Sequence, residues 1–278
     1  MSSVTRRIQE IKQPKGGFIK PSEFEAIVMQ DNTTLNSEEN IHPSVIGIAV
    51  DYLTRFIIGT DVRKAFRISL KGAEAAEIMG QKKSISVAEK LLKGIKGLDN
   101  TSVVNACKLV TFDVWYRSPL AALNSKGYDE TNPDKMTIQN IQIMVKRSLS
   151  FFEKYGPITS DGFSFEPVNA DISVYEKMMK TGKGSFGGYT PTVSSGDGDF
   201  LTKDTLWDFK VLKSKPTNKH TLQLLMYWIM GQHSGQEVFK KIIQLGIFNP
   251  RLNTVYLLKI EHIPKDVIKT VEKEVICY

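Results

Sequence analysis

The stretch "GDGDFLTKDTLWDFK", residues 196–210, decides the fold because it predicts a β-hairpin that carries unusually many charges. Two segments of β-prone residues, 198–202 and 205–212, are joined by the polar run Thr202-Lys203-Asp204-Thr205. Such a run between two strand-like segments is typical of a tight turn. We therefore expect a hairpin whose two-residue turn is centred on Lys203 and Asp204.

The turn fixes which side chains of the hairpin meet. A two-residue turn at this position places Asp199 opposite Asp208 and Phe200 opposite Trp207. Because side chains alternate between the faces of a strand, Asp208 and Lys210 share one face and the aromatic residues form the other. Opposed side chains on adjacent strands lie about 5 Å apart. One face is thus expected to carry two carboxylates and an ammonium, whereas a three-residue turn would separate the carboxylates.

Two carboxylates in direct opposition need a compensating cation, because like charges in that position destabilise a sheet. Lys210 could supply it, which would make the stretch a salt-bridged strand edge. A divalent metal is the alternative, because Mg²⁺ binds carboxylate oxygens and leaves coordination positions for water and substrate phosphates. A metal, two carboxylates and a lysine are together the parts required for phosphodiester hydrolysis.

Composition limits the class of protein. The chain has 278 residues, 41% of them hydrophobic, which is enough to fill a substantial core. Its apolar runs are shorter than the roughly 20 residues of a membrane span, and the polar N-terminus does not resemble a signal peptide. We therefore expect a soluble, cytoplasmic protein with no membrane partner. The net charge of +7 is compatible with a polyanionic partner.

The order of the segments predicts a helical block followed by a mixed part. Apolar residues recur three or four apart from Val45 to Ile58 and from Val62 to about Lys154, which indicates helices. From residue 181 onward strand-like and helix-like segments alternate, as in α/β or α+β proteins. We divide the chain into a polar N-terminal arm (1–40), a first core helix (41–60), a mainly helical insertion (61–180) and a core that contains the hairpin (181–278).

Other motifs carry weaker signals. Residues 182–187, Gly-Lys-Gly-Ser-Phe-Gly, fit a dinucleotide-binding pattern, but a helix-like segment precedes them where a strand is required. We interpret them as a loop. The triplet Glu10-Ile11-Lys12 has the acid-x-lysine spacing of Asp208 to Lys210 but no aspartate about ten residues before it. Cys107 and Cys277 are distant in sequence and are interpreted as reduced thiols.

With these residues in place, the C-terminal part resembles the PD-(D/E)xK nuclease superfamily, in particular its RecB-like branch. The resemblance covers residues 44–55 and 194–230 and depends on Asp199, on Asp208-Phe209-Lys210 after the turn, and on Gln223-Leu224-Leu225-Met226-Tyr227 in the next helix. That branch also has Gly-x-x-x-His-x-x-Leu in an early helix. Here Gly47 to Leu53 stands at that place with Asp51 in the position of the histidine, which is a departure from the pattern.

The resemblance implies a restriction-endonuclease-like core, a mixed central sheet flanked by helices, with a large helical insertion. It also implies site roles. Asp199 and Asp208 would bind Mg²⁺ or Mn²⁺ with the backbone carbonyl of Phe209, and Lys210 would position the attacking water. Gln223 and Tyr227, which lie at i and i+4 on one helix face, would border the site. Asp51 either binds metal as a third acid or packs.

A basic segment follows the predicted catalytic strand. Lys213, Lys215, Lys219 and His220 follow that strand, interrupted by Ser214, Pro216, Thr217 and Asn218. Lysines next to a metal site would neutralise flanking phosphates, a contribution that does not depend on base sequence. The alternative is a solvated loop that caps the helix through Thr217 or Asn218.

The sequence thus predicts a Mg²⁺-dependent nuclease acting on DNA, with Asp199, Asp208, Lys210, Gln223 and Asp51 at its centre. Lys213, Lys215, Lys219 and Tyr227 are the expected nucleic-acid contacts. Two other interpretations stay open. One is a module that keeps the nuclease fold and binds nucleic acid or a protein partner without turnover. The other is a salt-bridged strand in an unrelated α/β protein.

Overall fold

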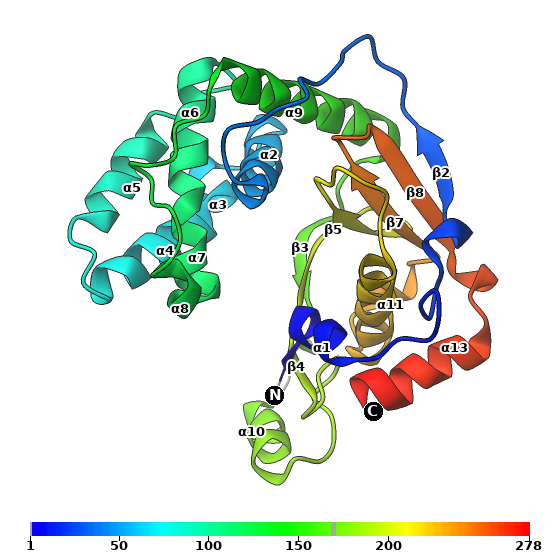
Figure 1. The fold of residues 1–278 in the computed structure, drawn as a ribbon. Helices are drawn as coiled ribbons and strands as arrows, with labels where there is room; N and C mark the ends of the chain where they lie inside the picture. The colour runs from blue at the N-terminus through cyan, green and yellow to red at the C-terminus, as the bar shows by residue number, and fades with distance from the viewer. Residues whose placement is uncertain (1, 168–170) are drawn as a thin grey trace. The chain divides into compact units, whose positions relative to one another are not determined.

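A computed structural model describes residues 2–167 and 171–278 and divides the chain into two compact units (Figure 1). One unit comprises Met1–Met29 and Phe152–Tyr278 and contains the main β-sheet, so we call it the sheet unit. The other comprises Gln30–Phe151 and is built from helices, so we call it the helical unit.

The sheet unit is organised around a six-stranded mixed sheet with the strand order β2-β8-β7-β6-β5-β3. The strands of this sheet are β2 (Glu25–Val28), β3 (Ser160–Ser164), β5 (Asp197–Leu201), β6 (Thr205–Phe209), β7 (Gln244–Asn249) and β8 (Thr254–Lys259). Strands β6 and β7 are parallel and all other neighbours are antiparallel. This confirms the expected mixed sheet. Strands β1 (Ser2–Ser3) and β4 (Val193–Ser195) form a second, two-stranded sheet.

The expected hairpin is present with the expected register. Strands β5 and β6 pair with Phe200 opposite Trp207 and Leu201 opposite Leu206. The N–H of Thr202 donates to the carbonyl of Thr205 at 3.0 Å, which closes the two-residue turn. Since both the pairing and the turn agree with the prediction, the alternation of side chains follows as well.

The position of the hairpin in the sheet differs from the expected strand edge. Strand β6 lies in the interior of the sheet between β5 and β7, and all five of its residues are buried. Trp207 packs against Phe200 and Tyr155 on one face of the sheet. The other face is covered as well, because Leu206 belongs to the main hydrophobic cluster. The carboxylate of Asp208 is therefore enclosed by the core, and β6 is not an exposed edge.

Helix α11 (Asn218–His233) is the central helix of the sheet unit, and it connects β6 to the parallel strand β7 (Figure 1). It begins at Thr217, the helix N-cap, as the sequence allowed. Its apolar side chains are buried almost all round, as expected for a helix in the core. Leu222, Leu225 and Met226 join Leu206 and Leu245 in the main cluster. Leu206 lies two residues before Asp208, so Asp208 points to the same face of the sheet, toward α11.

The N-terminal arm is more ordered than its polar composition suggests. It forms helix α1 (Val4–Glu10), a 3₁₀ turn at Pro21–Glu23 and strand β2 at the end of the sheet. Val4, Ile8, Ile19 and Phe24 are buried in the main cluster. The few apolar residues of this segment are therefore core residues of the sheet unit.

The rest of the sheet unit consists of short helices and turns. After β3 comes α10 (Ile172–Thr181), and after α11 come α12 (Glu237–Lys240), a 3₁₀ turn at Ile260–His262, α13 (Lys265–Thr270) and a π-helical turn at Val271–Ile276. Helix α12 has a single turn, because Gln244 already begins β7.

The helical unit contains the helices predicted between residues 43 and 154. They are α2 (Pro43–Ile57), α3 (Val62–Ala65), α4 (Arg67–Ile78), α5 (Ser84–Lys93), α6 (Asn100–Leu109), a 3₁₀ turn at Val110–Phe112, α7 (Asp113–Arg117), α8 (Pro119–Ala122) and α9 (Lys135–Tyr155). The boundaries differ from the division made on the sequence. Helix α2, expected as the first core helix, clusters with the helical unit, while β3 and α10 belong to the sheet unit.

Candidate active site

The candidate site contains the two aspartates of the hairpin, Asp199 and Asp208, which lie close together. Asp208 is only 2% exposed. Asp199, on β5, accepts a hydrogen bond through its Oδ2 from the N–H of Phe209 at 2.6 Å. Burial raises the pKa of the Asp208 carboxyl well above its usual range, and the charge of Asp199 raises it further. The hairpin therefore holds two acidic groups in an environment that disfavours their joint negative charge.

Lys210 offsets part of this charge. Its Nζ lies 3.0 Å from Oδ1 of Asp208, and its side chain is 24% exposed. The ammonium opposes the increase in the pKa of Asp208. The predicted proximity of Asp208 and Lys210 is thus confirmed. Unlike the buried carboxylate, the Lys210 side chain is partly accessible to solvent.

The second oxygen of Asp208 is a buried acceptor that receives no hydrogen bond. Within the part of the chain that the structure describes, no donor reaches Oδ2 of Asp208. Buried carboxylate oxygens are normally hydrogen-bonded or bound to a cation, because desolvation without a partner is costly. An oxygen in this state beside a second carboxylate fits a hard divalent cation.

Few protein side chains are available as ligands for such a cation. Across residues 2–167 and 171–278, no group of three or more His, Cys, Asp or Glu side chains is arranged to bind a metal. Asp199 and Asp208 would supply two carboxylates, and the remaining positions would fall to water, substrate phosphate or a backbone carbonyl. Mg²⁺ is commonly bound by one or two carboxylates in this way. The role of the Phe209 carbonyl stays a prediction.

Helix α11 brings two further predicted residues to the pair. Nε2 of Gln223 donates to the hydroxyl oxygen of Tyr227 at 2.8 Å, so the two residues share a helix face as predicted. Burial, followed by the negative charge of Asp208, raises the pKa of Tyr227. The hydroxyl of Tyr227 therefore remains protonated and fixes the orientation of the Gln223 amide.

Tyr227 does not have the exposure expected of a nucleic-acid contact. It is only 4% exposed, and its ring packs edge-to-face on Phe163 at 5.8 Å between centroids. A side chain enclosed in this way cannot touch a phosphate or stack on a base. The contact role expected of Tyr227 is therefore unsupported, and its observed bond to Gln223 is a positioning contact. The burial of Tyr227 could not be predicted from the sequence, because a tyrosine four residues after Gln223 is equally compatible with a core position.

His220 lies near the site, although the sequence analysis assigned it no catalytic role. Its Nδ1 accepts a hydrogen bond from the N–H of Thr217 at 2.9 Å, at the first turn of α11. Burial, and then the charge of Lys210, lowers the pKa of His220 to about 4. The imidazole is thus neutral at physiological pH and carries its proton on Nε2. Lys213, Lys215 and Lys219, the predicted nucleic-acid contacts, are exposed along the same segment.

Asp51, the predicted third acid, lies on α2 of the helical unit. Its Oδ1 accepts a hydrogen bond from Nε of Arg55 at 2.8 Å, one helical turn later. This ion pair accounts for an acidic residue on a half-buried helix face. The metal-binding role of Asp51 stays a prediction.

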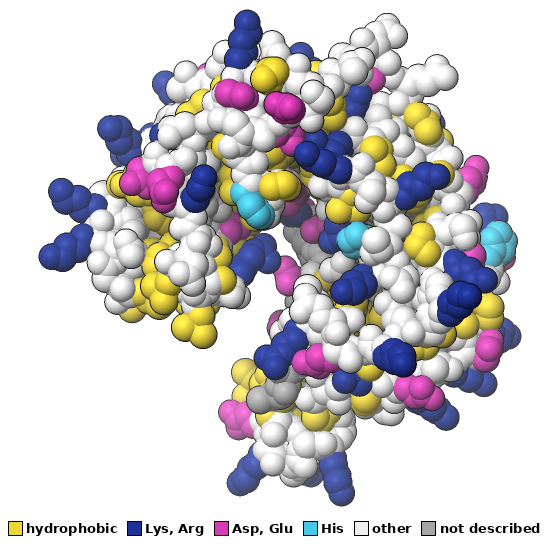
Figure 2. Space-filling view, in the orientation of Figure 1, with side chains coloured by type: hydrophobic (Ala, Val, Ile, Leu, Met, Phe, Trp, Pro, Cys, Tyr) yellow, Lys and Arg dark blue, Asp and Glu magenta, His cyan; other side chains and the backbone are white. Residues whose placement is uncertain are grey.

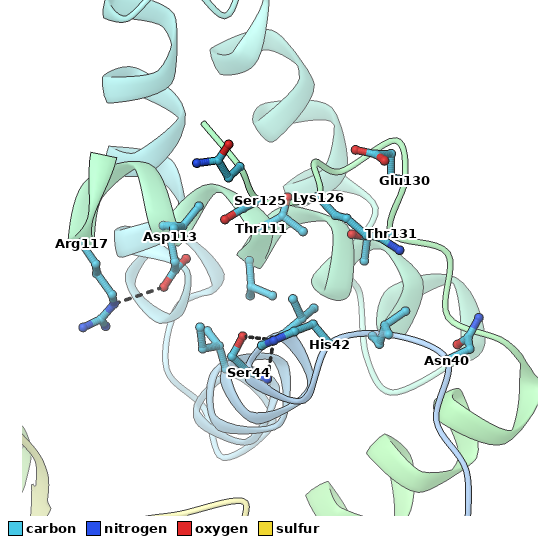
Figure 3. A pocket seen from close by; sticks show the side chains of 16 residues that line it. Asn40, His42, Ser44, Thr111, Asp113, Arg117, Ser125, Lys126, Glu130 and Thr131 are labelled. Atoms are coloured by element: carbon cyan, nitrogen blue, oxygen red, sulfur yellow. Dashed lines mark hydrogen bonds and ion pairs between the residues drawn. The ribbon is translucent and has the colours of Figure 1, made fainter. Parts of the chain in front are cut away.

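The helical unit contains a cavity of its own, of about 590 Å³ (Figure 3). The start of α2 and helix α7 contribute to its wall, and Asp113 and Arg117 form an ion pair there at 3.8 Å. Asp113 is 1% exposed and accepts hydrogen bonds from the hydroxyls of Tyr52 and Ser69. Both of its oxygens are thus committed to structural partners. Asp199 and Asp208 of the hairpin therefore remain the candidate acidic pair.

The glycine-rich segment is a loop, as interpreted from the sequence. Helix α10 ends at Thr181, and Gly182 follows with a left-handed φ of +66° that terminates the helix. The strand required before a dinucleotide-binding turn is thus replaced by a helix.

Comparison of the chain with protein-family models, with curated proteins and with solved structures found no match. Among the helices of the described residues, none has both the length and the hydropathy needed to cross a bilayer.

Proposed function

We propose that the protein is a nuclease that hydrolyses phosphodiester bonds of DNA with the help of Mg²⁺ or Mn²⁺. The observation that carries the proposal is the buried Asp208 carboxylate, which has one oxygen 3.0 Å from Lys210 and the other without a donor, beside Asp199. The proposal includes a restriction-endonuclease-like core in the sheet unit. The hairpin register and the position of α11 after β6 support that assignment.

In this proposal each residue has a limited task. Asp199 and Asp208 hold the metal, which when bound polarises the phosphate and lowers the pKa of a coordinated water. Lys210 orients the water that attacks phosphorus and offsets negative charge as the P–O bond breaks. Gln223 contacts the substrate or the water from α11, and Tyr227 holds the Gln223 amide in place.

Cleavage assays with matched variants test the proposal. Linear duplex, circular duplex and single-stranded DNA are each incubated with the protein and Mg²⁺ or Mn²⁺. We expect Lys210→Ala to slow cleavage by a factor on the order of 10²–10³, the usual loss when one charge-stabilising donor is removed. Lys203→Ala, which removes an exposed lysine in the hairpin turn, should retain activity. An inactive wild-type protein, or equal cleavage by Lys210→Ala, would overturn the proposal.

A second function, nucleic-acid or partner binding without turnover, is favoured by one observation. Asp51 stands where the resemblance has a histidine, and it is ion-paired with Arg55. An inert module predicts DNA binding that is unchanged in EDTA and absence of cleavage with any divalent metal. The nuclease proposal instead predicts metal-dependent product.

A further inference from the structure

Two segments far apart in the sequence meet at the first turn of α11. The hydroxyl of Thr221 donates to the carbonyl of Ile19 at 2.7 Å, and Ile19 is fully buried. Gly17 lies so close to the helix that a Cβ added to it would stand 2.5 Å from Cβ of Asn218. Residues 11–22 of the arm are therefore fixed against residues 218–221.

A turn with left-handed glycines allows this close approach. Gly16 and Gly17 have φ values of +90° and +98°, a region that other residues rarely adopt. The N–H of Gly17 donates to the carbonyl of Pro14 at 2.9 Å, which closes the turn. The arm thus has a defined path over the start of the helix.

Both segments are purely basic. Residues 11–22 contain three lysines and residues 211–222 contain three more, and neither segment contains Asp or Glu. All six lysines, Lys12, Lys15, Lys20, Lys213, Lys215 and Lys219, are exposed. The structure shows no ion pair for any of the six within the residues it describes. Glu10, the nearest acid before the arm segment, is paired with Arg6 and Arg7. Figure 2 shows Lys and Arg side chains over the region of α1, α11 and the arm, with Asp and Glu side chains between some of them.

This basic surface borders the candidate active site. Lys219 is followed by His220, whose pKa is lowered in part by the charge of Lys210. Gln223 lies one helical turn beyond Lys219 and donates to Tyr227, whose pKa is raised in part by the charge of Asp208. A polyanion lying on the six lysines would therefore extend toward Asp208.

We propose that residues 11–22 of the arm and residues 211–222, which lead into the first turn of α11, form one composite surface that binds the phosphate backbone of the nucleic-acid substrate. The inference rests on the proposed nuclease function and adds the N-terminal arm to its substrate-binding machinery. The arm lysines neutralise phosphates several nucleotides away from the scissile bond. Their contribution is independent of base sequence and decreases as salt concentration increases.

The test compares three triple variants that each remove three positive charges. The arm variant is K12Q/K15Q/K20Q, and the loop variant is K213Q/K215Q/K219Q. The control is K177Q/K180Q/K183Q, which changes three exposed lysines in and after α10. Gly188, which follows them, lies near the C-terminal end of α11, because a Cβ added to it would stand 2.6 Å from the carbonyl oxygen of Met230. Fluorescein-labelled duplex and single-stranded DNA are titrated in EDTA over a range of NaCl concentrations.

We expect the arm and loop variants to bind DNA more weakly and with a smaller salt dependence. Each phosphate contact contributes about 0.9 to the slope of log K against log [salt] for duplex and about 0.7 for single strands. Loss of three contacts should thus reduce the slope by about 2 to 3 in either variant. The control should match the wild type, and K12R/K15R/K20R should restore binding, because Arg retains the charge.

The outcomes separate this inference from the proposed function. If the wild type binds and cleaves DNA while the arm variant keeps the wild-type affinity and slope, the composite surface is wrong and the nuclease proposal stands. If the arm variant loses affinity but the wild type cleaves nothing with any metal, the surface is supported and the nuclease proposal is wrong. A control variant as weak as the arm variant would reduce the effect to net charge and overturn the inference.

Discussion

At the scale of single residues, buried ionisable groups distinguish the two units. In the sheet unit, the buried Asp208 has one ammonium and one other carboxylate as charged neighbours. In the helical unit, the equally buried Asp113 is satisfied by two hydroxyls. A fully hydrogen-bonded acid is a structural element, whereas a buried acid with one oxygen lacking a donor, beside a second carboxylate, is a candidate for a cation. This difference, rather than the size of the nearby cavity, directs the functional proposal to the hairpin.

The buried acid of the helical unit should make stability depend on pH. Burial raises the folded-state pKa of Asp113 above its unfolded value of about 3.9. The carboxyl therefore keeps its proton more readily in the folded state, and its contribution to stability is lost as pH increases from about 4 through the folded pKa. Relative to the wild type, Asp113→Asn should become progressively more stable over that window. Urea unfolding at a series of pH values measures the difference, and a constant difference would contradict the expectation.

The two cysteines should react at very different rates. Burial raises the pKa of Cys107 to about 12, and its side chain is fully enclosed in α6. Cys277 is only half buried near the C-terminus. Because the thiolate is the reactive form, one thiol per chain should react quickly with Ellman's reagent in the folded protein and a second only in denaturant. Cys277→Ser should abolish the fast phase, and a persistent fast phase in that variant would show Cys107 to be accessible.

At the scale of elements, the hairpin strand β6 is packed against strand β7, which comes after helices α11 and α12 in the chain. Strand β7 pairs with β6 through Gly246, which lies opposite Trp207. A Cβ added to Gly246 would stand 2.4 Å from the indole ring of Trp207. The absence of a side chain at Gly246 thus leaves room for the indole of Trp207. Trp207 directly precedes Asp208 in strand β6.

Gly246→Ala should therefore disturb both stability and activity. Overpacking of this kind typically costs about 1–3 kcal/mol, because the indole must move or the strands must separate. Gly97→Ala is the matched control, since an added Cβ there has its nearest neighbour at 4.0 Å. Denaturant unfolding gives the free energies, and cleavage by the folded variants gives the effect on the site. Equal stability of the two variants would show that the indole has room to adjust.

The elements also show which features the sequence could predict. The register of Phe200 with Trp207 was predictable because a two-residue turn and strict alternation determine it locally. The interior position of β6 was not, because it depends on β7 and β8, which follow 35 or more residues later. The packing of the arm could not be predicted for the same reason: Ile19 is held by Thr221, a contact that no local pattern indicates. The placement of α2 with the helical unit likewise depends on packing between distant segments.

At the scale of the whole molecule, the two units should respond differently to metal. A ligand that binds only the folded state stabilises it by about 2.7 kcal/mol at a concentration 100 times its Kd. If Asp199 and Asp208 hold Mg²⁺ or Mn²⁺, the added stability belongs to β5, β6 and α11 of the sheet unit. Hydrogen exchange measured with and without Mg²⁺ should show slower exchange in those elements and unchanged exchange in α4 to α7.

Asp208→Asn should abolish this protection by metal, because it removes a ligand charge. Asp197→Asn changes an exposed position on the same strand as Asp199 and should retain the protection. Protection that appears in the helical unit instead, or that persists in Asp208→Asn, would place the metal elsewhere and remove the chemical basis of the nuclease proposal.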